Sequence, residues 1–214
     1  GGDLLRDTLD KLENINRWLG GNKVTIKGLE KILQNHPKEQ EITIIDIGCG
    51  HGDILRDVAK FGRKQHYKFN LIGVDANPTA IAYANELSLK YPELSFKTQD
   101  IFSNEFKRSQ FDVVLATLFL HHFKEDQLVS FLETTSKQAK IGVVVNDLHR
   151  HKMAYYLFKL LSVFIANKMI VNDGLISVLR GFKRKELVTI SKKINIQPQI
   201  SWKWAFRFLW IIKK

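Results

Sequence analysis

The sequence predicts an α/β fold, built on a doubly wound sheet of seven strands that is mostly parallel and has an antiparallel last strand. Three observations predict it. Runs rich in β-branched residues, such as 42–47, are typical of strands buried on both faces of a parallel sheet. Segments with helical spacing of apolar residues separate these runs, so strands and helices alternate. Two late runs, 199–203 and 205–212, are too close in sequence for a parallel crossover and must pair antiparallel.

The predicted elements follow one another in a regular order. Two helices, 4–18 and 26–34, come first, and the pair Gly20-Gly21 ends the first of them. Strands are expected at 42–47, 70–75, 95–101, 111–117 and 142–146. Helices are expected at 53–61, 78–89, 125–139, 153–165 and 184–193. The chain therefore divides into an N-terminal helical cap, 1–40, and a sheet domain, 41–214, with a helix inserted after the fifth strand.

Composition limits the classes of protein to consider. A chain of 214 residues suits one hydrophobic core. The single cysteine, Cys49, excludes a disulfide framework within the chain and favours a reducing, cytoplasmic location. We expect no transmembrane segment, because charged residues interrupt the longest apolar stretch. The net charge of +11 fits an acidic partner or a membrane surface, but the basic residues are scattered, as on an ordinary solvated surface.

A glycine-rich turn carries the main functional signal. Gly48-x-Gly50-x-Gly52 follows the first strand and opens a helix, and Asp75 ends the second strand. Ligands of open α/β sheets bind at this edge, and an acid at the second strand tip can accept hydrogen bonds from ribose hydroxyls. The glycine spacing is shorter than that of the dinucleotide fingerprint. Asp46, two residues before the turn, would repel a pyrophosphate and favour a cation, so a dehydrogenase is a weaker alternative.

In this order the motifs resemble those of the class I S-adenosylmethionine-dependent methyltransferases, which have a Rossmann-like sheet. The resemblance implies S-adenosylmethionine as the cofactor. It implies that the glycine turn holds the methionine part of the cofactor and that the tip of the second strand holds the ribose and adenine. It also implies that the exit of the third strand faces the adenine amine, and that the exit of the fourth strand lines the cofactor and the acceptor. The residues implied, in that order, are Asp46, Gly48, Cys49, Gly50 and Asp53; Asp75, Ala76 and Asn77; Asp100 and Ile101; and Thr117 and Leu118.

Histidines at two strand exits are the candidate catalytic bases, because histidine exchanges protons near neutral pH. His121 and His122 follow the fourth strand. His149 follows the fifth strand, with Asp147 expected to orient it and Arg150 to hold a phenolate or carboxylate of the substrate. The alternative is that these side chains cap helices or neutralise their own loop. We expect no metal, because the histidines lack metal-ligand spacing.

The last third of the chain is loosely similar to small-molecule methyltransferases of polyketide and quinone pathways. Tyr155 and Tyr156 lie on an apolar helix that could cover a substrate, and Trp18 could form a second cover. The function expected is methyl transfer to a small apolar or aromatic acceptor. An oxygen atom is the preferred nucleophile, and an activated ring carbon is the alternative.

Two other functions stay open. The positive charge suggests an RNA methyltransferase. Enzymes that methylate amino groups of bases resemble a family with a Pro-Pro-aromatic motif after the fourth strand, and this chain lacks that motif. Cys49 lies on the wrong side of the cofactor for a covalent mechanism. Methylation of backbone ribose remains possible. The second alternative is a non-catalytic protein that binds the cofactor. The sequence leaves the oligomeric state open.

Overall fold

The fold is a seven-stranded sheet with helices on both faces, in a computed structural model that describes residues 2–164, 167–197 and 199–214. The strand order is β3-β2-β1-β4-β5-β7-β6. The strands are β1 (Glu41–Ile47), β2 (Lys68–Asp75), β3 (Leu94–Thr98), β4 (Phe111–Thr117), β5 (Ala139–Leu148), β6 (Gln199–Lys203) and β7 (Arg207–Lys213). β7 pairs antiparallel with β5 and β6, whereas β3, β2, β1, β4 and β5 pair in parallel. The predicted fold class is therefore confirmed.

Helices connect the strands and cover the sheet. The α-helices are α1 (Gly2–Trp18), α2 (Gly21–Leu33), α3 (Asp53–Gln65), α4 (Pro78–Leu87), α5 (Asn104–Arg108), α6 (Glu125–Gln138), α7 (Lys152–Leu161), α8 (Lys168–Arg180) and α9 (Arg184–Lys193). Two short 3₁₀ turns, η1 (Leu120–His122) and η2 (Ser162–Phe164), complete the helical elements. Among the helices described, none has the length and apolar character needed to cross a bilayer.

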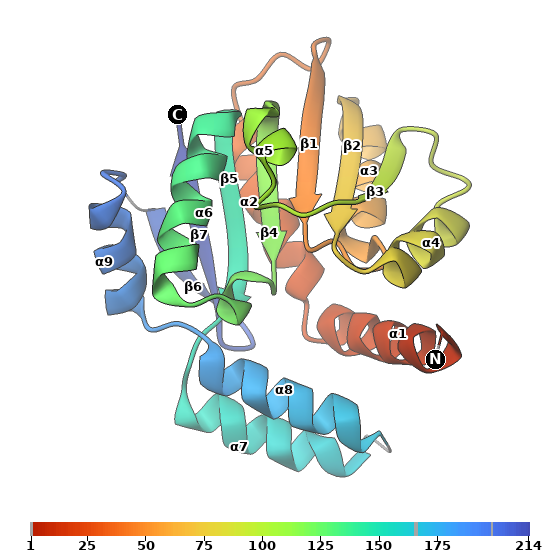
Figure 1. Cartoon of the computed structure of the whole chain (residues 1–214), viewed down its shortest axis with the longest axis vertical. Helices are drawn as coiled ribbons and strands as arrows, with labels where there is room; N and C mark the ends of the chain where they lie inside the picture. The colour runs from red at the N-terminus through yellow and green to blue at the C-terminus, as the bar shows by residue number, and fades with distance from the viewer. Residues whose placement is uncertain (1, 165–166, 198) are drawn as a thin grey trace.

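Two apolar layers form the core, one on each face of the sheet. Side chains of α2 and α3 pack on one face, where Leu29 and Leu55 are fully buried. Side chains of α5, α6 and α9 pack on the other, where Phe106 and Leu132 are buried. The strands are apolar on both sides because both faces are covered. α4 packs against β2 and β3. Helices α1, α7 and α8 lie beyond the edge where the parallel strands end (Figure 1), and that edge is the one available to a ligand.

The structure differs from the predicted boundaries at several places. α2 begins at Gly21 rather than residue 26, because Gly20 adopts a left-handed conformation that ends α1 and lets the next helix start at once. The third strand ends at Thr98 rather than residue 101. The expected helix 153–165 ends at Leu161, and residue 165 lies outside the described residues. Neither α5 nor α8 was predicted, since α5 is five residues long and α8 has a glycine within it.

Removal of a core tryptophan should destabilise the protein strongly. Trp210 on β7 is completely buried. We expect Trp210→Ala to lower the free energy of unfolding by about 3–5 kcal/mol, because the indole leaves a cavity that the sheet cannot refill. Urea unfolding followed by circular dichroism measures the change. Trp204→Ala is the matched control, since Trp204 is 74% exposed, and its effect should stay within about 0.5 kcal/mol. Equal effects of the two variants would contradict the assigned core.

Candidate functional site

The turn between β1 and α3 is held open by three glycines in left-handed conformations. Their φ angles are 73° at Gly48, 53° at Gly50 and 80° at Gly52, values that residues other than glycine rarely adopt. A Cβ at Gly48 would lie 2.2 Å from the ring of Phe119, so that position also needs glycine for space. At Gly50 a Cβ would meet only Leu9, 3.8 Å away. A ligand can therefore approach the backbone closely at Gly50.

The end of β2 anchors this turn. The backbone N–H groups of Gly48 and Cys49 donate to the carbonyl of Val74, over 2.9 and 3.1 Å. The N–H of Gly50 donates to Oδ2 of Asp75 over 3.0 Å, and the other oxygen of Asp75 accepts from the N–H of Asn77 over 2.9 Å. Asp75 thus joins the tip of β2 to the glycine turn, as expected for adjacent strand ends.

Asp46 is a buried carboxylate that lacks a full set of partners. It lies at the end of β1 and is 2% exposed, and its Oδ1 has no hydrogen-bond partner among the described residues. Burial, followed by the charges of Asp53 and Asp75, raises the pKa of Asp46 well above its ordinary value. Burial also raises the pKa of the Cys49 thiol. Three carboxyl groups near one turn favour a positively charged ligand group.

The other residues expected around an adenosine lie along the tips of β2 and β3. Asn77 caps α4, where its side chain accepts from the N–H groups of Thr79 and Ala80. Ala76 is exposed beside it. Asp100 is also exposed and accepts from the N–H of Phe102 over 2.9 Å, and Ile101 packs partly against the core. These groups form a solvent-facing shelf next to the glycine turn, and their role in binding stays a prediction.

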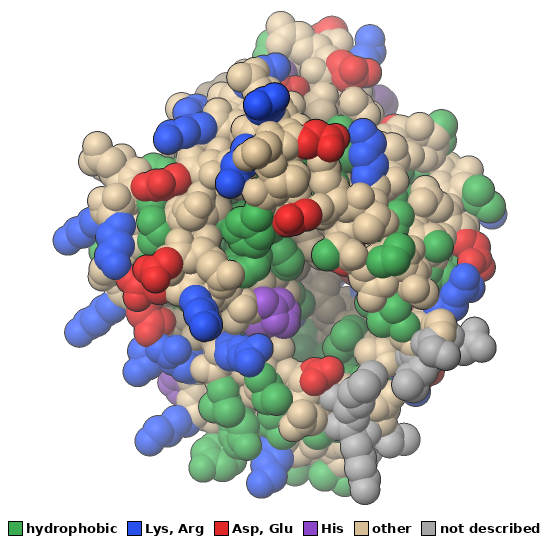
Figure 2. Space-filling model, viewed as in Figure 1, with side chains coloured by type: hydrophobic (Ala, Val, Ile, Leu, Met, Phe, Trp, Pro, Cys, Tyr) green, Lys and Arg blue, Asp and Glu red, His purple; other side chains and the backbone are tan. Residues whose placement is uncertain are grey.

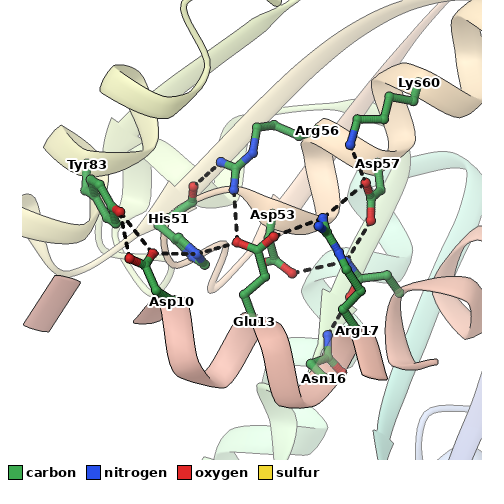
Figure 3. Close-up of polar contacts among 11 residues, drawn as sticks. Asp10, Glu13, Asn16, Arg17, His51, Asp53, Arg56, Asp57, Lys60 and Tyr83 are labelled. Atoms are coloured by element: carbon green, nitrogen blue, oxygen red, sulfur yellow. Dashed lines mark hydrogen bonds and ion pairs between the residues drawn. The ribbon is translucent and has the colours of Figure 1, made fainter. Parts of the chain in front are cut away.

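A polar network fastens α1 over the glycine turn (Figure 3). Glu13 is its centre: His51 donates to Glu13 over 2.8 Å, Arg56 over 3.3 Å, and Arg17 forms an ion pair at 2.9 Å. The hydrogen bond from His51 holds the pKa of Glu13 below its ordinary value. Arg56 also donates to the carbonyl of His51. Because His51 belongs to the turn itself, α1 and the turn form one unit.

Further contacts extend the network to both sides of α1. Tyr83 on α4 donates to both carboxylate oxygens of Asp10, over 2.9 and 3.0 Å. Near the other end of α1, the amide of Asn16 donates to Asn22, which donates in turn to Asp53 over 3.2 Å. The sequence analysis missed Glu13 and Arg56, since their partners lie far along the chain and no local motif marks them.

A cavity of about 640 Å³ opens beside the turn. Figure 2 shows a hollow on this side of the molecule and hydrophobic side chains gathered over α7 and α8. The cavity is enclosed by α1, the glycine turn, the exits of β4 and β5, helices α7 and α8, and the β6–β7 turn. Most of its lining is apolar, including Leu12, Ile15, Leu19, Ile54, Leu118, Leu148, Ala154, Leu157, Phe158, Leu161, Val178, Trp202 and Phe206.

His121 and Asp147 form a buried pair in the cavity wall. Nδ1 of His121 donates to Oδ1 of Asp147 over 2.7 Å, and the two side chains are 3% and 2% exposed. Asp147 also accepts from the N–H groups of Leu120 and His121, over 2.8 and 3.2 Å, and from Leu148 over 2.7 Å. A histidine held at Nδ1 keeps Nε2 as its proton acceptor when neutral. This geometry can support a general base.

The other polar candidates lie apart from this pair. The pairing expected between Asp147 and His149 is wrong, because Asp147 binds His121 at the neighbouring strand exit. His149 lines the cavity, and its buried Nδ1 has no partner among the described residues. Burial and then His151 lower the pKa of His149. Arg150 forms an ion pair with Glu186 on α9 and does not line the cavity.

The remaining expected residues divide between the cavity wall and its surroundings. Thr117 and Leu118 line the cavity, and Thr117 is hydrogen-bonded to Thr25 of α2 over 2.9 Å. Trp18 also lines it, at the end of α1. His122, Tyr155 and Tyr156 are not among the lining residues. In α7, the cavity-facing side chains are instead Ala154, Leu157, Phe158, Leu160 and Leu161.

Comparison with known proteins identifies the family. A family model described as "Methyltransferase domain" matches residues 38–156, which are 119 of the 214 residues. The chain belongs to the methyltransferase domain family. The match covers β1 to the start of α7, and so it contains the glycine turn, Asp75 and the His121–Asp147 pair.

The chain is also similar to curated methyltransferases. A "Ubiquinone biosynthesis O-methyltransferase" of Rickettsia bellii is 28% identical over 135 residues, which cover 60% of this chain and 51% of the relative. The chain spans about half the length of the curated relatives that it matches first.

Solved structures show the same fold. The plantazolicin methyltransferase BpumL in complex with SAH has a TM-score of 0.69 at 18% identity, over 98% of this chain and 90% of that one. Magnesium protoporphyrin IX methyltransferase from Synechocystis PCC 6803, with bound SAH, has a TM-score of 0.60 at 14% identity, over 91% of this chain and 84% of that one.

The buried charge of Asp46 should make the ligand-free methyltransferase less stable at high pH. A carboxyl group with a raised pKa stabilises the fold below its unfolded-state pKa of about 4, and this contribution is lost as pH rises toward the folded-state pKa. We expect Asp46→Asn to be more stable than the parent at pH 8, by on the order of 1 kcal/mol or more, and equally stable near pH 4. Urea unfolding at several pH values measures this. The exposed Asp126→Asn is the control; an Asp46→Asn difference that is constant with pH would contradict the assignment.

Proposed function

We propose that this chain transfers a methyl group from S-adenosylmethionine to an oxygen of a small apolar or aromatic acceptor. The observation that carries the proposal is the incompletely paired Asp46 beside the open backbone at Gly50, in a wall of the apolar cavity that His121 also lines. Membership of the methyltransferase family and the SAH complexes of its structural neighbours support the choice of cofactor.

The residues around the glycine turn suit a cationic nucleoside. Asp46 would attract the charged methionine portion, and the open face of Gly50 leaves room for it against the backbone. Asp75 would face the ribose, next to the shelf formed by Asn77 and Asp100. When bound, S-adenosylmethionine supplies a methyl group on positively charged sulfur, which a nucleophile can take directly. The protein's main task is then to align the acceptor and exclude water.

His121 is the proposed base. The acceptor hydroxyl would give its proton to Nε2 of His121 as its oxygen bonds to the methyl carbon, and the electron pair of the broken carbon–sulfur bond would leave with S-adenosylhomocysteine. Asp147 orients the ring through Nδ1 and stabilises the imidazolium that forms. His149 is the second candidate base: it also lines the cavity, but no carboxylate among the described residues orients it.

The cavity supports a small acceptor. Its apolar side chains from α1, α7, α8 and the β6–β7 turn would exclude water from an aromatic or aliphatic molecule. The O-methyltransferases of ubiquinone biosynthesis among the relatives support an oxygen nucleophile. Among the described residues, the cavity lining includes Arg207 but no lysine, whereas binding of an RNA backbone depends on several basic side chains.

Cofactor binding should depend on Asp46. Isothermal titration calorimetry is expected to show binding of S-adenosylmethionine and S-adenosylhomocysteine by the parent protein. Asp46→Asn should weaken both, by roughly tenfold or more, because a charge-assisted contact is lost. S-adenosylmethionine should lose more, since its sulfonium adds a second positive charge. Asp126→Asn should bind as the parent does. Unchanged affinity in Asp46→Asn, or binding of NADH in place of both compounds, would overturn the proposal.

Catalysis should depend on His121. We expect His121→Gln to lower kcat for methyl transfer to a panel of phenols by about 10²–10⁴-fold and to leave the Kd for S-adenosylhomocysteine unchanged. His122→Gln is the matched control, because the neighbouring ring does not line the cavity. If His149→Gln lowers kcat by this factor and His121→Gln does not, the base is His149.

A further inference from the structure

Arg207 is a buried cation in the wall of the cavity. It is the first residue of β7, is 2% exposed and is one of the lining residues. Its Nη2 donates to Oδ1 of Asn16 over 2.9 Å. Its Nε and Nη1 have no hydrogen-bond partner among the described residues. A guanidinium in such a position is unusual, because a buried charge that lacks partners strongly destabilises the fold.

The carboxylate of Asp147 does not supply partners for the free nitrogens of Arg207. The charge of Asp147 acts on Arg207, but no ion pair within 4 Å joins them in the described part of the chain. Both oxygens of Asp147 are already occupied: Oδ2 by the N–H groups of Leu120 and His121, and Oδ1 by His121 Nδ1 and the N–H of Leu148. Burial lowers the pKa of Arg207 to about 10, which still leaves it protonated at neutral pH.

The surrounding chain is shaped to hold the guanidinium. A Cβ at Gly21 would lie 2.9 Å from Cζ of Arg207 and 1.9 Å from Oδ1 of Asn16, so only glycine at this position leaves space for both side chains. Asn16 is held in turn by Asn22. Residues from α1, α2 and β7 therefore meet to place one arginine, with two nitrogens left over, beside an apolar cavity.

The position of Arg207 favours the acceptor over the cofactor as its ligand. β7 is separated from β1 by β4 and β5, and neighbouring strands lie about 4.8 Å apart. Arg207 pairs in register with Leu148, beside the exit of β5, and borders the part of the cavity lined by Leu148, His149 and Phe206. The glycine turn and Asp75 lie at the other strands.

We propose that Arg207 binds a carboxylate of the acceptor, so that the substrate is an aromatic or apolar molecule with both an acidic group and the methylated hydroxyl. This proposal rests on the proposed function and narrows its substrate class. The apolar lining would hold the body of the molecule, Nε and Nη1 of Arg207 its carboxylate, and the His121–Asp147 pair its hydroxyl proton. The methionine carboxylate of the cofactor is the other source of the same chemistry, and the experiment separates the two.

The test compares a phenolic acid with its ester. 3,4-Dihydroxybenzoate and its methyl ester are titrated by calorimetry into the parent, Arg207→Gln, Arg207→Lys and the control Lys203→Gln. Lys203 is the register partner of Arg207 on β6 and does not line the cavity. The parent and Lys203→Gln should bind the acid about tenfold to hundredfold more tightly than the ester. Arg207→Gln should lose this preference with its thermal stability kept or raised, and Arg207→Lys should keep part of it.

Binding of S-adenosylhomocysteine separates the possible outcomes. Its affinity should be the same in the parent and Arg207→Gln. If that affinity falls in Arg207→Gln while the preference for the acid persists, Arg207 binds the cofactor carboxylate and the proposal is overturned. Equal binding of the acid by the parent and Arg207→Gln also overturns it. If no variant binds S-adenosylhomocysteine but the acid still requires Arg207, the anion site stands and the methyl-transfer function fails.

Discussion

The junction between the glycine turn and the end of β2 is the constraint on which the rest of the site depends. Backbone bonds from Gly48 and Cys49 to Val74, and from Gly50 to Asp75, hold two adjacent strand tips together. Left-handed backbone at three positions makes this tight turn possible. It leaves Asp46 buried at the end of β1, with no hydrogen-bond partner for Oδ1 among the described residues, and it places His51 where α1 can reach it. The same bonds therefore bring the carboxyl groups together at the glycine turn and position His51, through which α1 is attached.

The cover and the core are held by different forces. α2 packs on the sheet so closely that a Cβ at Gly28 would lie 2.5 Å from Val144. α1 is attached largely through charges and hydrogen bonds centred on Glu13 (Figure 3). Exposed ion pairs contribute little to stability, so the half-buried contacts to His51 and Arg56 carry most of this attachment. A helix held by polar groups can border a ligand site without filling it with its own side chains.

Polarity divides the cavity into distinct regions. Carboxylates gather at the glycine turn, an oriented histidine lies at the exit of β4, and a buried arginine lies at the start of β7. Apolar side chains from α7, α8 and the β6–β7 turn lie between and around them. In a low-dielectric wall each of these groups acts strongly on whatever is near it, because water does not screen it. The arrangement can therefore orient one molecule that carries several kinds of group.

The sequence by itself determined the sheet, the site of the glycine turn and the positions of Asp46 and Asp75, because each follows from periodicity or spacing over a few residues. Local pattern also placed His121 and His149 at strand exits. Only the tertiary structure decided which histidine Asp147 binds, since β4 and β5 lie side by side although 26 residues separate the partners. The same holds for Arg207 and Asn16, which are 191 residues apart. Arg207 directly precedes the apolar run 208–212, which is a local sign of that site. Only the packing of α1, α2 and β7 shows that its guanidinium is buried beside the cavity.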